Sequence, residues 1–433
     1  MSEFLTIHEA AARIRAGKLR PIELFEQCWD RIDRYEAQVR AWAYLDYDGA
    51  RRQAEQLTQE WQRNHYRGPL HGIPLGIKDI IDVFDMPTGC GSTLWATSFA
   101  RADAECVRRL RQAGAIILGK TVTTAYASFD PPPTRNPWHL ERTPGGSSSG
   151  SAAAVACGMC LGALATQTGG SITRPASFCG VVSLKPTWGR VSVTGVLPLA
   201  PRLDHVGVMA SSATDCAILF DAIRTAPTAP RRIRQRLLEP NDAAAFGLLE
   251  PTMAEAFATF RTTTATRDWH WHNHTLPPSF ADVRHYHYLL MAVGAAAYHG
   301  ERFQRRPHDY PPSVSQLIRD GLQCSAADYE RALKHHAQFQ TDIDHSFPKG
   351  WDTFATPAAP GPAPSADTTG NPVFNAPWSY AGLPTLSLPI GWSREGLPLS
   401  VQLIGRRHHD EQLLQLAQRL EATCAIIRPP LPL

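Results

Sequence analysis

The chain has no hydrophobic run that approaches the roughly 18 apolar residues of a membrane-spanning helix. It also has little net charge: +3 over 433 residues gives no reason to expect nucleic acid or an anionic membrane as a partner. The opening residues lack the basic and then apolar pattern of a secretory signal. With 43% hydrophobic and 19% charged residues, the composition predicts a globular protein. Because neither a signal pattern nor a membrane span is evident, we expect it in the cytoplasm.

Paired cysteines are missing as well. The nine cysteines are odd in number, scattered and mostly set among apolar residues, which favours buried thiols over a disulfide framework. Cys157 and Cys160 match Cys-x-x-Cys, but no second pair accompanies them, so core packing is favoured over redox or metal chemistry.

Five histidines gather at positions 270, 272, 274, 285 and 287, and alternation would put the first three on one face of a strand. No acidic or cysteine partner keeps a recognisable ligand spacing with them. We therefore predict surface or pocket-lining histidines, and neither a metal nor another cofactor. The role of the group from His270 to His287 stays open.

Two glycine–serine clusters mark the middle of the chain. The first, at 145–150, predicts a turn that leads into small residues typical of a tightly packed helix. It lacks the lysine before serine or threonine that a phosphate-binding loop needs. The second, at 168–171, follows the buried strand pattern of 163–166. A glycine pair before a serine leaves backbone N–H groups unobstructed around that hydroxyl, as an oxyanion hole requires.

Lys78 lies in an apolar, strand-like run, where a charged lysine is costly to bury. Taken alone, this run favours a lysine at a strand edge paired with Asp79 or Asp82. The surrounding pattern Gly-Ile-Pro-x-x-x-Lys-Asp at 72–79 adds to the two clusters, whose serines 147 and 171 lie 24 residues apart. With Arg174-Pro175 and Phe178-Cys179-Gly180, these motifs resemble the amidase signature family of serine hydrolases, over about residues 5 to 425.

The resemblance implies a Ser-Ser-Lys triad. Ser171 would be the nucleophile that forms an acyl-enzyme, and Ser147 would relay its proton to Lys78. The peptide Gly146–Ser147 would be cis. Within the first cluster Ser148, Ser149 and Ser151 are rivals to Ser147, and Thr166 is a lesser rival to Ser171.

The resemblance also implies that the oxyanion hole consists of backbone N–H groups of Thr168, Gly169, Gly170 and Ser171. We further predict substrate contacts for Tyr126, Ser148 and Gln167. Val122, Ala125 and Gln167 stand where the family usually has Asn, Glu and often Asp. These departures imply altered specificity rather than a lost triad.

The implied fold is α/β: a single large domain, 1–433, with a central twisted mixed β-sheet covered by helices on both faces. Alternation of helix and strand patterns at 105–120 agrees with it. Further strands are expected at 191–193 and 206–209, and a linker at 226–236. Its regions would be N-terminal helices (1–65), the catalytic core motifs (68–210), a variable substrate-pocket region (225–345), and C-terminal strands and a helix (350–425).

The implied activity is that of an amidase, a hydrolase of carbon–nitrogen bonds other than peptide bonds, acting on a small carboxamide, carbamate or urea-like compound. The alternative is an amidotransferase subunit that releases ammonia from glutamine within a complex, although no basic extension for tRNA is evident. A non-catalytic binding protein is a third interpretation. The family also makes a homodimer an expectation.

Overall fold

The computed structural model describes residues 5–228, 233–241, 246–247 and 249–433, so residues 229–232 of the predicted linker lie outside it. Its α-helices are α1 (Ile7–Arg15), α2 (Pro21–Val39), α3 (Tyr47–Gln62), α4 (Glu105–Gln112), α5 (Ser149–Cys157), α6 (Thr173–Cys179), α7 (Ala213–Ile223), α8 (Pro251–Ala265), α9 (Val283–Arg305), α10 (Pro312–Gln323), α11 (Ala326–His345), α12 (Ala376–Ala381) and α13 (Asp410–Cys424). Its strands are β1 (Trp42–Leu45), β2 (Pro74–Lys78), β3 (Ile116–Thr121), β4 (Gly162–Gln167), β5 (Val182–Lys185), β6 (His205–Ala210), β7 (Arg236–Pro240), β8 (His270–His274), β9 (Thr353–Pro357), β10 (Thr385–Trp392) and β11 (Pro398–Gly405).

In this described part of the chain the strands form one eleven-stranded sheet, in the order β1-β3-β2-β4-β6-β5-β10-β11-β9-β7-β8. β2 runs parallel to β3 and β4, and β7 runs parallel to β8 and β9. The remaining neighbours are antiparallel. The predicted mixed sheet is therefore confirmed, and the pairing of β5 with β10 joins the middle of the chain to its C-terminal part.

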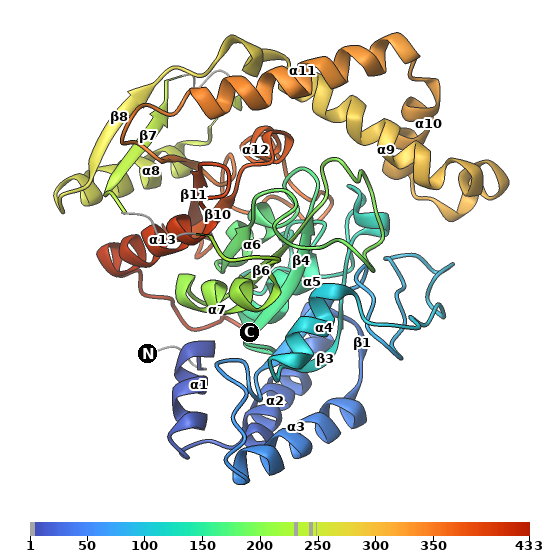
Figure 1. Ribbon diagram of the computed structural model, residues 1–433, viewed down its shortest axis with the longest axis vertical. Helices are drawn as coiled ribbons and strands as arrows, with labels where there is room; N and C mark the ends of the chain where they lie inside the picture. The colour runs from blue at the N-terminus through green and yellow to red at the C-terminus, as the bar shows by residue number, and fades with distance from the viewer. Residues whose placement is uncertain (1–4, 229–232, 242–245, 248) are drawn as a thin grey trace.

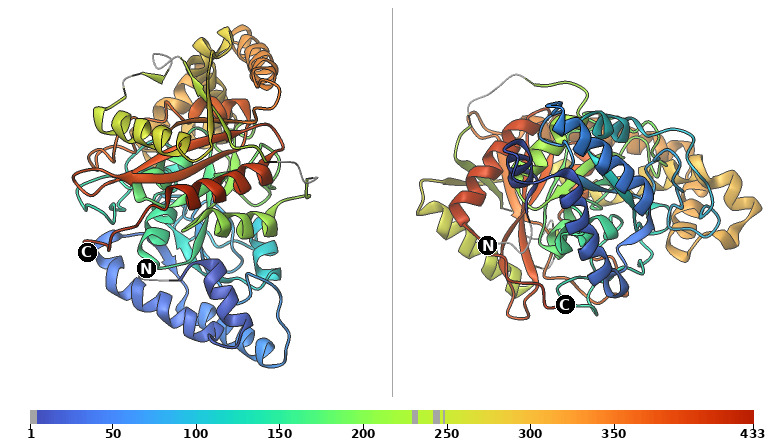
Figure 2. Two further views of the ribbon diagram at one scale, coloured as in Figure 1. Left: turned by 90° about the vertical axis from the view of Figure 1, so that its left-hand side faces the viewer. Right: turned by 90° about the horizontal axis from the view of Figure 1, so that it is seen from below.

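Helices cover both faces of the central strands. Every residue of β2, β4, β6, β9 and β11 is buried, which a strand achieves only when both of its faces are covered. α5 packs on β2, β3 and β4 beside α6, while α7 packs on β4, β5 and β6 beside α13. Helices α1 to α3 lie at one end of the molecule and α9 to α11 at the other (Figures 1 and 2).

Small side chains let α5 lie close to its neighbours. All nine of its residues are buried, and a Cβ added at Gly150 would lie 2.1 Å from the carbonyl oxygen of Ala41. The helix ends at Cys157 and is capped by Gly158, which adopts a left-handed conformation with φ 67°. The sequence prediction of a tightly packed small-residue helix is confirmed.

The strand predicted at 191–193 is wrong. Val191 forms only an isolated bridge with Arg224. Gly189 and Gly195, each with φ 80°, bracket the segment with turns. Within the segment, Val193 O accepts a hydrogen bond from the N–H of Val196 at 3.1 Å, which is the bond of a local turn and not of a strand ladder.

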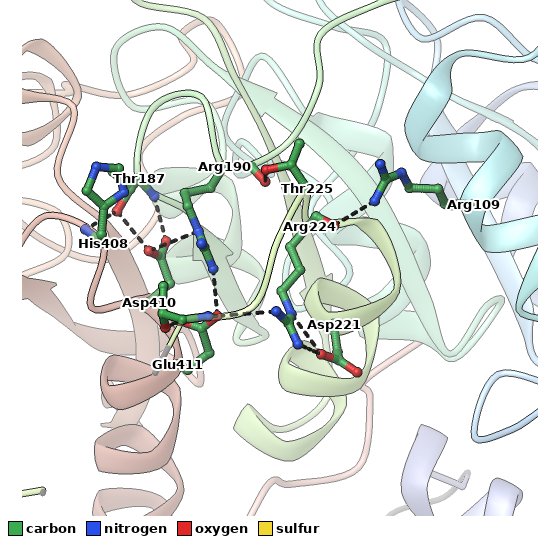
Figure 3. Close-up of polar contacts among 10 residues, drawn as sticks. Arg109, Thr187, Arg190, Asp221, Arg224, Thr225, His408, Asp410 and Glu411 are labelled. Carbon is green, nitrogen blue, oxygen red and sulfur yellow. Dashed lines mark hydrogen bonds and ion pairs between the residues drawn. The ribbon is translucent and has the colours of Figure 1, made fainter. Parts of the chain in front are cut away.

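A cluster of charged side chains fastens α13 to the rest of the fold (Figure 3). Asp410, the first residue of α13, is fully buried and accepts hydrogen bonds from the N–H and hydroxyl of Thr187, at 2.6 and 2.9 Å. Arg190 lies 3.7 Å from the same carboxylate and donates to Glu411 at 2.6 Å. Glu411 is also 3.7 Å from Arg224. The C-terminal helix is thus tied to the loop after β5 and to the end of α7.

None of the helices in the described ranges is long and apolar enough to cross a membrane. All nine cysteines are free, and seven of them are buried, Cys157 and Cys160 included. These two thiols lie at the end of α5, within the main hydrophobic core.

Candidate active site

The predicted triad residues lie around the carboxyl ends of two parallel strands, β2 and β4, where α/β sheets commonly form their sites. Lys78 is the last residue of β2. Ser147 lies just before α5, and Ser171 lies in the turn between β4 and α6. The parallel register of Ile77 with Leu164 brings the end of β2 beside the segment that leads to Ser171.

Lys78 is completely buried, and its Nζ faces hydroxyl groups rather than a carboxylate. It lies 2.7 Å from Ser147 Oγ and 2.8 Å from Thr166 Oγ1. Burial lowers the pKa of Lys78 well below its ordinary value of 10.5, and the Asp204 carboxylate opposes this shift only in part. A lysine in this setting can be neutral near physiological pH and can then accept a proton.

The simpler sequence interpretation, an ion pair between Lys78 and a neighbouring aspartate, is not what the structure contains. Asp79 pairs with the buried Lys120, at 3.1 Å. Lys120 also donates to Pro87 O at 2.8 Å. Lys120 therefore forms the ion pair with Asp79, and Lys78 contacts the hydroxyl groups of Ser147 and Thr166.

Ser147 is distinguished from its rivals by its partner. Only its hydroxyl, among the described serines of the first cluster, contacts Lys78. The other hydroxyls bond to backbone carbonyls: Ser148 to Thr166 O at 3.2 Å, Ser149 to Gly145 O at 2.6 Å and Ser151 to Leu164 O at 3.0 Å. The peptide Gly146–Ser147 is cis, as the resemblance implied.

The second cluster presents a row of free backbone donors. Across the described chain, none of the N–H groups of residues 168–171 donates a hydrogen bond to the protein. Ser171 is partly exposed, and its hydroxyl makes no hydrogen bond to any described residue. Free donors beside an open hydroxyl are what the stabilisation of an oxyanion requires.

Neighbouring groups hold this loop in place. The side-chain oxygen of Gln167 accepts from the N–H groups of Ile172 and Thr173, at 2.6 and 2.9 Å. Its amide nitrogen donates to Ser379 Oγ at 2.8 Å, and Ser379 in turn donates to Gly169 O at 2.6 Å. The loop is therefore fixed from inside the protein.

Gly170 is closely surrounded. A Cβ there would lie 2.8 Å from Asn375 Oδ1 and 3.2 Å from a guanidinium nitrogen of Arg174. Arg174 is fully buried, donates to Gly146 O at 2.8 Å, and has its pKa lowered to about 9 by burial. The two serine clusters are thus joined through this arginine.

The three residues predicted to contact substrate form hydrogen bonds inside the protein. Tyr126 is buried, with its hydroxyl 2.9 Å from Ser92 Oγ and its ring stacked on Tyr310. Ser148 bonds to the backbone of β4, and Gln167 holds the loop before α6. These contacts support positioning roles, and substrate contact by the three stays a prediction.

Sequence reasoning missed two polar neighbours of the site. From the sequence Thr166 is only a rival nucleophile, yet in the structure its hydroxyl accepts a hydrogen bond from Lys78. Asp204 accepts a 2.5 Å hydrogen bond from the Thr168 hydroxyl and supplies negative potential near Lys78. Thr166 could have been found from its place in the strand beside β2. Asp204 carries no local sequence signal.

Comparison with known proteins places the chain among amidases. The Amidase family model matches residues 23–414. Putative amidase AmiD of Mycobacterium tuberculosis is 33% identical over 450 residues, covering 95% of this chain and 92% of the relative. The A-type subunit of the glutamyl-tRNA(Gln) amidotransferase of Moorella thermoacetica is 33% identical over 476 residues, covering 96% of each.

A solved structure agrees with these relatives. The crystal structure of an amidase superimposes with a TM-score of 0.89 at 32% identity, covering 96% of this chain and 99% of that one. The predicted fold and enzyme class are confirmed. The chain therefore belongs to the amidase family.

Proposed function

We propose that the chain hydrolyses the carbon–nitrogen bond of a small carboxamide, carbamate or urea-like compound through an acyl-enzyme on Ser171. One observation carries this proposal: a fully buried lysine 2.7 Å from a serine hydroxyl, next to a loop of free N–H donors that ends at an open serine. Membership of the amidase family supplies the reaction class.

In the first step Ser171 Oγ attacks the carbonyl carbon, and a new C–O bond forms. The proton of Ser171 passes to Ser147 Oγ, whose own proton passes to the neutral Nζ of Lys78. The electron pair of the C=O bond moves onto oxygen. N–H groups of residues 168–171 then stabilise the resulting oxyanion.

Collapse of this intermediate breaks the C–N bond, and the proton held by Lys78 returns through Ser147 to the departing nitrogen. Ammonia or an amine leaves, and the acyl group remains as an ester of Ser171. Water attacks this ester by the same sequence of proton transfers, which releases the acid and restores the free serine. No metal or redox step is needed to balance the reaction.

A second candidate function has its own support. The similarity to an amidotransferase component, over 96% of both chains, favours ammonia release from glutamine inside a complex. The two functions share the triad and differ in whether the isolated chain is active.

A homodimer stays a prediction, which sedimentation of the purified protein can check.

The test is ammonia release by the purified chain from acetamide, butyramide, benzamide, phenylurea and glutamine. We expect turnover of at least one non-glutamine amide and its loss in Ser171→Ala. Ser177→Ala is the matched control, because that hydroxyl is buried in α6 nearby without a hydrogen-bond partner among the described residues. Turnover of glutamine alone, and only when the partner proteins of an amidotransferase are added, would establish the second function instead.

A further inference from the structure

His287 is separated by the fold from the other histidines of its sequence group. It lies on α9, is buried, and has its Nε2 3.0 Å from the carbonyl oxygen of Thr168. The others lie on β8 or on the exposed side of α9: His270, His272, His274 and His285. One member of the group therefore reaches the loop that holds the free N–H donors.

The partner fixes the chemical form of this ring. A carbonyl oxygen can only accept, so Nε2 of His287 must carry the hydrogen and donate it. Burial lowers the pKa of His287, which keeps the ring neutral. The neutral ring is then a fixed donor to Thr168.

The hydrogen bond from His287 to Thr168 O also fixes the direction of the Gly169 N–H. The carbonyl of Thr168 and the N–H of Gly169 belong to one planar trans peptide, so they point in opposite directions. When His287 holds the carbonyl on the α9 side, the Gly169 N–H faces the other way. The ring also packs directly on the loop, because a Cβ at Gly169 would lie 3.4 Å from His287 Cε1.

The two following peptides are held in the same manner. Gly169 O accepts from Ser379, and Gly170 O accepts from the N–H of Arg174 at 3.0 Å. Three consecutive carbonyls thus have donors, while the three N–H groups of the same peptides bond to none of the described residues. The first of these carbonyls depends on a residue of the variable region, 225–345.

We propose that His287 is a positioning residue of the oxyanion hole, which orients the Thr168–Gly169 peptide so that the Gly169 N–H can bind the developing oxyanion. This rests on the proposed function. Through His287, helix α9 would then influence the rate of the chemical step. A residue outside the two serine clusters would then control how well the hole is formed.

The test compares wild type with His287→Leu, which removes the donor, and His287→Gln, whose terminal amide N–H can occupy the place of Nε2–H. His285→Gln is the matched control, two residues away on the exposed side of the same helix. The first readout is the second-order rate at which a fluorophosphonate labels Ser171. The second is the steady-state hydrolysis of p-nitrophenyl butyrate, and thermal melting checks the folding of each variant.

We expect His287→Leu to lower the labelling rate and kcat by about 10- to 100-fold with KM nearly unchanged, below the 10²–10³ loss typical of removing an oxyanion donor itself. His287→Gln should stay within about threefold of wild type, and His285→Gln should equal it. A glutamine variant as slow as the leucine variant, a leucine variant at the wild-type rate, or a change in KM alone would overturn the proposal.

Should His287→Leu fail to fold, His287→Asn takes its place, because its shorter amide stays polar but ends short of Nε2. Labelling of wild type at Ser171 with no slowing in the variants would refute only the role of His287. A wild type that is not labelled at all would overturn the proposed function and this inference together.

Discussion

Replacing Lys78 by methionine should abolish activity and, at pH 7, stabilise the fold. Lys78 must be neutral in the folded protein to act as a base, whereas in the unfolded chain its pKa is 10.5. Giving up that proton at pH 7 costs about 5 kcal/mol, at about 1.36 kcal/mol per pKa unit. Methionine, with a similar length and no charge, avoids this cost.

The substitution also removes the hydrogen bonds to Ser147 and Thr166, each worth about 1 kcal/mol. Lys78→Met should therefore be about 3 kcal/mol more stable than wild type at pH 7. Between pH 7 and 9 the unfolded state binds one more proton at Lys78 than the folded state does. Wild type thus gains about 1.36 kcal/mol per pH unit, and the difference should nearly vanish at pH 9.

Urea unfolding followed by tryptophan fluorescence at both pH values measures this difference. Lys18→Met, at an exposed position, is the control, and its effect should be the same at pH 7 and pH 9. A Lys78→Met variant that differs from wild type by the same amount at both pH values would show that Lys78 keeps its proton in the fold. Its role as the base would then be refuted.

Three further outcomes are expected. Thr166→Val removes a hydroxyl from Lys78, and should lower kcat/KM about tenfold, measured across pH 6 to 9; an unchanged value would show that this contact does not tune the base. Asp410→Asn weakens the buried acceptor of Thr187, and should cost about 2 to 4 kcal/mol in urea unfolding while activity per folded molecule is kept; lost activity in folded enzyme would contradict this separation. Gly170→Ala should remove most activity without unfolding, because its Cβ would lie 2.8 Å from Asn375 Oδ1 and the loop of N–H donors must shift to relieve this clash; full activity would mean that Asn375 moves instead and the loop keeps its place.

The parts of the site that sequence predicts are those carried by short local patterns. The glycine-serine turns, the small-residue helix after them and the strand that ends at Lys78 all follow from neighbouring residues. The sequence also favours Ser147 and Ser171 over the other serines as triad residues, because Ser147 directly follows two glycines and Ser171 follows another pair.

The contacts that activate these residues come from distant segments. The sequence does not say whether Asp79 pairs with Lys78 or with Lys120. The register of the sheet places Asp79 beside Lys120, and Lys78 contacts hydroxyl groups instead. His287 reaches Thr168 across 119 positions of the chain, and nothing local separates it from His285. Tertiary packing determines which of these distant side chains contact each other, and local sequence patterns do not predict it.

The most direct test of the triad is the intact mass of the protein after exposure to a fluorophosphonate, with the modified peptide identified, for wild type, Ser171→Ala and Ser147→Ala. We predict one adduct on Ser171 in wild type, none in Ser171→Ala, and much slower labelling at Ser171 in Ser147→Ala. An adduct of equal yield in Ser171→Ala would place the nucleophile on another serine and contradict the mechanism.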